Sequence, residues 1–175
     1  MSCVFFIGGA SASGKTTVAL KLATTNSLSL IHLDAFYNTL RPAFKSDSDL
    51  EVATKSICQV AATHILAIGR KCILDGGWID PEVAVALFGP SAAIYCGYED
   101  KDLGKRYDRI LSKNEHWLKD ESKENALSFL QKQADGSEWY KSECKECNLP
   151  YVDFTNFPNH IPSEISSRFS EWFNA

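Results

Sequence analysis

The fold is decided by the stretch Gly9-Ala10-Ser11-Ala12-Ser13-Gly14-Lys15-Thr16. It follows an apolar run over residues 3–7 that has the length of a buried strand, and it opens a helical pattern over 15–24. Glycines at both ends let such a loop turn its amides toward a phosphate at the positive end of the following helix. The stretch therefore predicts a strand, a phosphate-binding loop and a helix, with nucleotide contacts from Gly9, Ala10, Ser11, Ala12, Ser13, Gly14, Lys15, Thr16 and Thr17.

This spacing is the P-loop pattern, and it assigns expected roles to its last two residues. Lys15 is expected to bridge the β- and γ-phosphates as a catalytic residue, and the Thr16 hydroxyl is expected to bind Mg²⁺. ATP and Mg²⁺ are the cofactors that follow. The alternative without a ligand is a serine- and glycine-rich turn that only connects two elements, and the flanking strand and helix argue against it.

Strand-like and helical stretches alternate along the rest of the chain. Buried strands are predicted at 3–7, 28–33, 72–74, 92–96 and 151–154, and helices at 15–24, 47–69, 81–88, 100–111, 125–147 and 163–173. This order predicts an α/β fold, a single domain over 1–175 with a five-stranded parallel sheet between two helical layers. Ligands of such sheets bind at the carboxyl ends of the strands.

Composition limits the partners. A net charge of −4 and a pI near 5.6 argue against binding of nucleic acid or an anionic membrane through bulk charge. The sequence shows neither a signal-peptide core nor a membrane span, so we expect a cytoplasmic protein, monomer or homodimer, whose partner is a small-molecule acceptor. Six cysteines are expected to be reduced thiols. Cys144 and Cys147 are included, with a metal or redox role for this pair as the alternative, and His64 is expected in the core of an apolar helix.

Other marks of P-loop classes are missing from the sequence. It has no Asn-Lys-x-Asp motif for guanine, no Leu-Ser-Gly-Gly-Gln signature and no room for the helical lid domain of an AAA module. Small kinases are the remaining class.

Residues 30–37, Leu-Ile-His-Leu-Asp-Ala-Phe-Tyr, resemble the second strand and following turn of uridine and nicotinamide riboside kinases. The resemblance implies a P-loop NTPase sandwich with sheet order 2-3-1-4-5 and a helical lid over about 105–135. Asp34 is the candidate general base, because a carboxylate beyond the second strand can face the P-loop and take a proton from an acceptor hydroxyl. A capping role is its alternative, and Ala35 stands where many relatives have a second acid.

The third strand leads into a second acid, in Asp75-Gly76-Gly77-Trp78. Asp75 at a buried strand end is the candidate Mg²⁺ ligand, and the glycines would let a substrate approach the backbone. The substrate side is expected to include Asp34, Phe36, Tyr37, Arg41, Gly76, Gly77 and Trp78. The aromatic residues could equally pack in the core, and Arg41 could be a solvated surface charge.

Arg106 and Arg109 share one face of the predicted helix after the fourth strand. By the resemblance they are catalytic candidates that neutralise the transferring phosphoryl group, and surface ion pairs with Asp102 or Asp108 are the alternative. Residues 112–123 are expected to form a mobile lid or an ordinary connection. Residues 148–156 resemble the junction between a helix and the last strand of small kinases, and the resemblance implies that Thr155, Asn156 and Phe157 lie beside the adenine, mainly through their backbone.

The sequence thus predicts an ATP- and Mg²⁺-dependent phosphotransferase acting on a small hydroxyl compound, nucleoside-like or another metabolite. Two alternatives stay open. One is an ATP-binding regulatory module without an acceptor. The other is a P-loop sulfotransferase, or a kinase directed at a sugar or an antibiotic.

Overall fold

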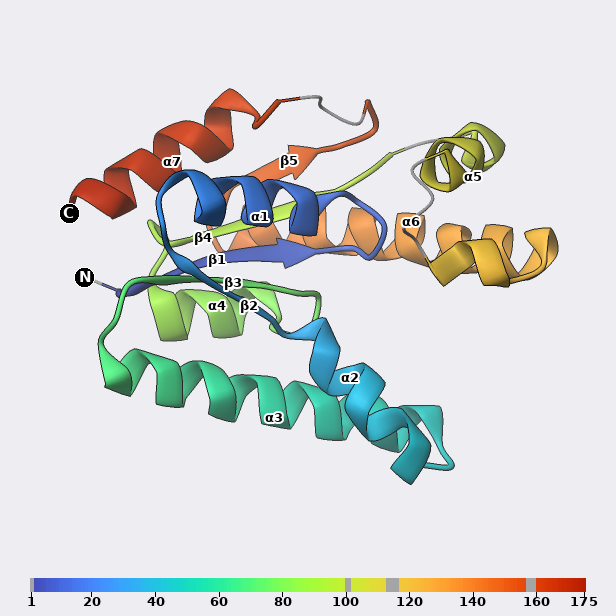
Figure 1. Cartoon of the computed structure of the whole chain (residues 1–175), viewed down its shortest axis with the longest axis horizontal. Helices are drawn as coiled ribbons and strands as arrows, with labels where there is room; N and C mark the ends of the chain where they lie inside the picture. The colour runs from blue at the N-terminus through green and yellow to red at the C-terminus, as the bar shows by residue number, and fades with distance from the viewer. Residues whose placement is uncertain (1, 100–101, 113–116, 157–159) are drawn as a thin grey trace.

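The structure, a computed structural model, describes residues 2–99, 102–112, 117–156 and 160–175. Its sheet is built from five strands: β1 (Val4–Gly9), β2 (Ser29–His32), β3 (Cys72–Asp75), β4 (Ala93–Gly97) and β5 (Tyr151–Asp153). All neighbouring strands are parallel, in the order β2-β3-β1-β4-β5, as the resemblance implied. Figure 1 shows the sheet between two layers of helices.

The predicted helices are present, with one addition. They are α1 (Lys15–Thr25), α3 (Asp47–Ile68), α4 (Pro81–Phe88), α5 (Leu103–Leu111), α6 (Lys123–Glu146) and α7 (Ser163–Asn174). The addition is α2 (Asp34–Leu40), which continues into the 3-10 turn η1 (Arg41–Ala43); a second such turn is η2 (Trp117–Asp120).

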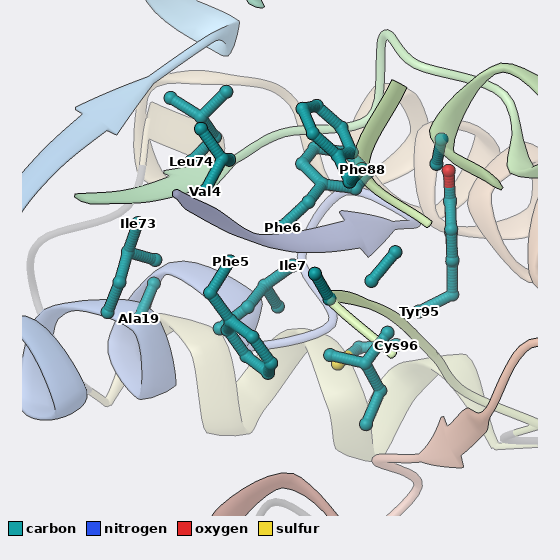
Figure 2. Packing of buried hydrophobic residues seen from close by; sticks show 14 of the residues in the cluster. Val4, Phe5, Phe6, Ile7, Ala19, Ile73, Leu74, Phe88, Tyr95 and Cys96 are labelled. Atoms are coloured by element: carbon teal, nitrogen blue, oxygen red, sulfur yellow. The ribbon is translucent and has the colours of Figure 1, made fainter. Parts of the chain in front are cut away.

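The central strand β1 is buried along its whole length and sends side chains into both layers. Phe5 packs on Phe169 and Trp172 of α7, with ring centroids 5.4 and 5.5 Å apart. Phe6 stacks on Phe88 of α4 at 5.3 Å. Figure 2 shows this alternation, with Phe5 on one side of β1 and Phe6 on the other. Because both faces are covered, the strand is apolar throughout rather than alternating.

The strand register brings the functional candidates to one edge of the sheet. Asp75 pairs with Ile7 on one side and with His32 on the other. The carboxyl ends of β1, β2 and β3 therefore meet where the P-loop leaves β1.

A second, smaller hydrophobic cluster supports the region predicted as a lid. Tyr98, Tyr107, Ile110 and Leu130 join Ala10 of the P-loop in it. Residues 113–116 of the predicted lid, and 100–101 of the predicted helix start, lie outside the described residues.

All six cysteines are free. The expectation for His64 is wrong. Its side chain is exposed, because the buried stripe of α3 runs through Leu50, Thr54, Cys58 and Ala62 and His64 lies outside it. Among the described residues, no helix combines the length and apolar composition that crossing a membrane requires.

Candidate functional site

The P-loop is shaped by backbone that side chains would obstruct. Gly9 has φ 119°, and a Cβ there would lie 1.9 Å from the Cys96 carbonyl oxygen of β4. Ala12 and Gly14 also have positive φ, 59° and 104°. Successive turns of this kind point backbone amides into one concavity, which suits an anion. α1 begins directly behind it, so its N-terminal dipole adds to the same preference.

A buried hydroxyl in the loop fits a phosphate ligand. The Ser13 Oγ is fully buried and has no hydrogen-bond partner within the described part of the chain. Burying a polar atom without a partner costs about 1–3 kcal/mol, which a ligand oxygen could recover. At another point of the loop, the Ser11 amide donates to Gln133 Oε1 of α6 at 2.8 Å.

The predicted metal ligands lie together. The Thr16 hydroxyl donates to Asp75 Oδ2 at 2.6 Å, at the start of α1 and the end of β3. A hydroxyl and a carboxylate are the hard oxygen donors that Mg²⁺ binds in proteins, with phosphate oxygens and water completing its shell. Thr16 and Asp75 therefore fit Mg²⁺ bound together with a triphosphate. Among the described residues, no group of three His, Cys, Asp or Glu side chains could hold a metal ion by itself.

His32 completes this contact network, and sequence reasoning missed it. Its Nδ1 lies 2.6 Å from Asp75 Oδ1, so both carboxylate oxygens are engaged, one by His32 and one by Thr16. The Asp75 side chain is 1% exposed and that of His32 is 45% exposed. The sequence shows only a histidine at the end of a strand. That His32 lies beside Asp75 follows from the register between β2 and β3.

Asp34 lies opposite the P-loop lysine. Its Oδ2 is 3.3 Å from Lys15 Nζ, and its Oδ1 accepts from the Gly77 amide at 3.1 Å. Lys15 is almost fully buried, while the Asp34 side chain is 42% exposed. The carboxylate thus has one oxygen fixed by backbone and the other at the lysine that would hold phosphate.

The turn after β3 closes this corner tightly. Gly76 has φ 155°, and a Cβ there would lie 2.8 Å from the Leu33 side chain and 3.1 Å from Asp34 Oδ1. The Gly77 carbonyl accepts from the Tyr140 hydroxyl of α6 at 2.7 Å. Burial is the main cause that raises the pKa of Tyr140 above its ordinary value, and the negative charges of Asp80 and Asp34 add to it. The phenol therefore stays protonated and can donate this hydrogen bond.

The predicted substrate residues separate into two groups. Tyr37 and Trp78 stack at 4.9 Å with their planes 12° apart, and both are half-buried beside Asp34 and Gly77. Phe36 packs against the main core, and so does the Trp78 ring of the stacked pair. Arg41 is exposed in η1.

Arg106 and Arg109 lie against the chain after β5. Arg106 is 1% exposed, donates to the Phe154 carbonyl at 3.1 Å and stacks over the Tyr98 ring at 3.5 Å. Arg109 donates to the Thr155 carbonyl at 3.1 Å. These backbone contacts differ from the ion pairs with Asp102 or Asp108 that were the alternative interpretation, and the phosphate roles of both arginines stay predictions. Asn156 is exposed next to this contact, and Phe157 lies outside the described residues.

Together, the sheet order and the loop define a P-loop protein with the fold of small-molecule kinases. A family model described as AAA domain matches residues 4–96, more than half of the chain, and the chain belongs to that family. The match ends within β4, so it does not extend to the region of an AAA lid. Comparison with curated protein sequences gave no match.

Solved structures of similar fold include several kinases. A gluconokinase from Sinorhizobium meliloti is 16% identical, with TM-score 0.61, over 98% of this chain and 94% of that one. Shikimate kinase from Bacteroides thetaiotaomicron is 15% identical, with TM-score 0.59, over 98% of both chains. Shikimate kinase from Acinetobacter baumannii, in complex with shikimate, is 13% identical, with TM-score 0.57, over 98% and 92%. At these identities the likeness concerns the fold.

Proposed function

We propose that this protein is an ATP- and Mg²⁺-dependent kinase that transfers the γ-phosphoryl group to a hydroxyl of a small molecule. The observation that carries the proposal is the 3.3 Å contact between Lys15 Nζ and Asp34 Oδ2. A phosphate-binding lysine and a carboxylate able to accept a proton meet at one point. A kinase needs both groups there, because the γ-phosphate and the acceptor hydroxyl must be adjacent for transfer.

Different residues of the chain bind the metal ion, bind the phosphates and accept the proton in the proposed reaction. ATP supplies the phosphoryl group when bound, and Mg²⁺ neutralises its charge. Thr16 and Asp75 would hold the ion, and Lys15 would exchange its contact with Asp34 for one with the phosphates. Asp34 then orients the acceptor and takes its hydroxyl proton while the new O–P bond forms and the bond to ADP breaks. The Gly77 amide keeps Asp34 oriented.

The acceptor side is proposed along α2 and the turn after β3. The half-buried stack of Tyr37 on Trp78 offers an apolar wall next to Asp34, and exposed Arg41 offers a positive charge on the same segment. An acceptor with a ring or apolar body beside its hydroxyl suits this surface. The structural neighbours named for gluconate and shikimate make hydroxy acids a second group to include.

The test is to incubate the protein with Mg-ATP and nucleosides, sugars, vitamins and hydroxy acids, gluconate and shikimate among them. Mass spectrometry should find one compound that gains a phosphate, with equimolar ADP. Tight ATP binding without transfer to any acceptor would favour the regulatory module instead. Transfer that survives in Lys15→Ala would contradict the proposal, because phosphate binding by the loop would then be dispensable.

We further propose that the protein works in the cytoplasm and binds no nucleic acid. Six free thiols fit a reducing compartment, and the net charge of −4 disfavours a phosphate-rich polymer.

A further inference from the structure

A side chain of α6 holds the backbone of the P-loop from outside. The Ser11 amide donates to Gln133 Oε1 at 2.8 Å, across 122 positions of the sequence. Within the described part of the chain, no other side chain from outside the motif hydrogen-bonds to the backbone of residues 9–14. The contact lies close to the predicted phosphate site, because the Lys15 amine is 3.5 Å from the carbonyl oxygen of Ala10, the residue before Ser11.

The loop has a backbone conformation that needs support from its surroundings. Ala12 has φ 59°, in the left-handed region that residues with a Cβ rarely adopt. The two residues before it are both held by neighbouring elements. The Ala10 amide donates to the Cys96 carbonyl of β4 at 3.0 Å, and the Ser11 amide donates to Gln133. Gln133 therefore restrains the loop directly before its strained residue.

Gln133 is itself held in place by the helix that carries it. One turn further along α6, the fully buried Ser137 hydroxyl donates to the Gln133 carbonyl at 2.8 Å and accepts from the Tyr98 amide at 3.1 Å. Two turns further, the Tyr140 hydroxyl donates to the Gly77 carbonyl. These three residues of α6 are four and three positions apart, so they lie on one face of the helix.

That face of α6 is hydrogen-bonded to three neighbouring parts of the site. Its partners are the P-loop after β1, the chain directly after β4 and the turn after β3. Figure 1 shows α6 extending past the carboxyl end of β1, where these segments meet. The Gln133 side chain is therefore presented to the loop by an element that is fixed at two further points.

We propose that Gln133 is a positioning residue that fixes the P-loop in its phosphate-binding conformation before a nucleotide binds. Its amide oxygen is the group that acts, because the Ser11 N–H can only donate. A loop that is already ordered loses less conformational entropy on binding, so this contact should increase nucleotide affinity. The inference rests on the proposed binding of Mg-ATP by the loop, and it does not depend on the acceptor.

Calorimetric binding of Mg-ATP and Mg-ADP tests this role, because both ligands place a β-phosphate in the loop. Gln133→Leu keeps a side chain of similar size without the acceptor oxygen. It should raise both dissociation constants about tenfold, the effect expected when one hydrogen bond to the loop is lost. Gln131→Leu is the matched control. This residue is exposed on the nearly opposite face of α6, and its replacement should leave both constants unchanged.

Two further measurements separate positioning from a general loosening of α6. Tyr140→Phe removes the hydrogen bond from the same helix face to Gly77 and should leave Mg-ATP affinity within about twofold of the wild type. Without nucleotide, hydrogen exchange of the Ser11 amide should be about tenfold faster in Gln133→Leu than in the wild type. It should stay slow in Gln133→Glu, whose carboxylate also accepts. Exchange is the readout for that variant, because its charge would repel phosphate.

The failure of this inference can be told apart from the failure of the proposed function. A Gln133→Leu variant that binds Mg-ATP as tightly as the wild type, or more tightly, would overturn the inference and leave nucleotide binding intact. An equal loss of affinity in Tyr140→Phe would also overturn it. If instead the wild type bound no Mg-ATP, or Lys15→Ala bound it equally well, the proposed function would fail and this inference with it.

Discussion

Asp34 is fixed by two contacts on its two carboxylate oxygens, one to a backbone amide and one to Lys15. Replacing it with asparagine keeps the shape and removes proton acceptance. We expect Asp34→Asn to bind Mg-ATP normally and to lower turnover roughly 10²–10⁴-fold, the usual contribution of a positioned base. Steady-state kinetics with the acceptor found in the panel, together with calorimetric ATP binding, would measure this.

The matched control for that variant is Asp108→Asn, at an exposed position on α5. It should leave turnover near the wild-type value. If Asp34→Asn were as active as the control, Asp34 would have only a structural role at the start of α2 and would not be the general base.

His32 acts on Asp75 and not on the reacting groups, so we regard it as a positioning residue. Its contact at 2.6 Å holds one carboxylate oxygen while Thr16 engages the other. Partners of this kind typically contribute about 10–100-fold to metal affinity. We expect His32→Ala to raise the Mg²⁺ concentration needed for ATP binding about tenfold, with unchanged Mg²⁺-free nucleotide affinity. Calorimetry at several Mg²⁺ concentrations would show this.

Two variants separate positioning from general destabilisation. His160→Ala, at an exposed position, should leave the Mg²⁺ dependence unchanged. His32→Asn keeps a hydrogen-bond donor and should recover part of the affinity. An equal loss of affinity with and without Mg²⁺ would contradict a role through Asp75.

At the residue scale, sequence reasoning found what local spacing encodes. Lys15 and Thr16 follow from the loop pattern, and Asp34 and Asp75 from their places at strand ends. His32 required the register of two strands, and Gln133 meets Ser11 from 122 positions away. No local pattern encodes such contacts.

Among the helices and strands, local sequence patterns likewise predicted the long elements and missed what depends on tertiary contacts. Long periodic helices such as α3 and α6 were predicted to within a few residues. The helix α2 was missed because it spans seven residues, buries no side chain fully and has no side-chain cap. Its contacts with α3 hold it in place, and such contacts are invisible to periodicity. The first strand was ended too early, because Gly9 still pairs with Cys96 of β4.

Buried thiols between the sheet and its helices make stability sensitive to alkali. Burial raises the pKa of Cys58, Cys96 and Cys144 to about 12, and that of Cys72 to about 11. In the unfolded chain a thiol ionises near its ordinary pKa of about 8.5. Above that pH the unfolded state releases protons that the folded state retains, so stability is complete below about pH 8.5 and falls as pH rises toward 12.

We therefore expect the free energy of unfolding to decrease between pH 8 and pH 10 by at most about 1.4 kcal/mol per pH unit for each thiol that stays protonated, and the urea midpoint to fall with it. Cys144→Ala should reduce the pH slope of stability, because one such thiol is removed. Cys3→Ala, at a half-buried position, serves as the control. A Cys144→Ala slope equal to the wild-type slope would assign the alkaline loss to other groups.

At the scale of the whole molecule, the P-loop joins two separately packed regions. The main core supports β1, and the smaller cluster of α5 and α6 reaches the loop through Ala10. A ligand bound by the P-loop contacts a surface that exists only in the folded state, so its binding free energy adds to the free energy of unfolding. At about 100 times its dissociation constant, Mg-ATP should contribute roughly 2.7 kcal/mol.

For a chain of this size that energy corresponds to a rise in Tm of roughly 5–10 °C, measurable by differential scanning calorimetry. Lys15→Met keeps the length of the side chain without its charge, and it should abolish most of the rise. Lys145→Ala, at an exposed position on α6, should keep it. AMP lacks the phosphates that the loop is predicted to bind, so it should stabilise the wild type little. Equal stabilisation by AMP and Mg-ATP would mean that the phosphates are not what the folded chain recognises, and the assignment of the loop would fail at its first step.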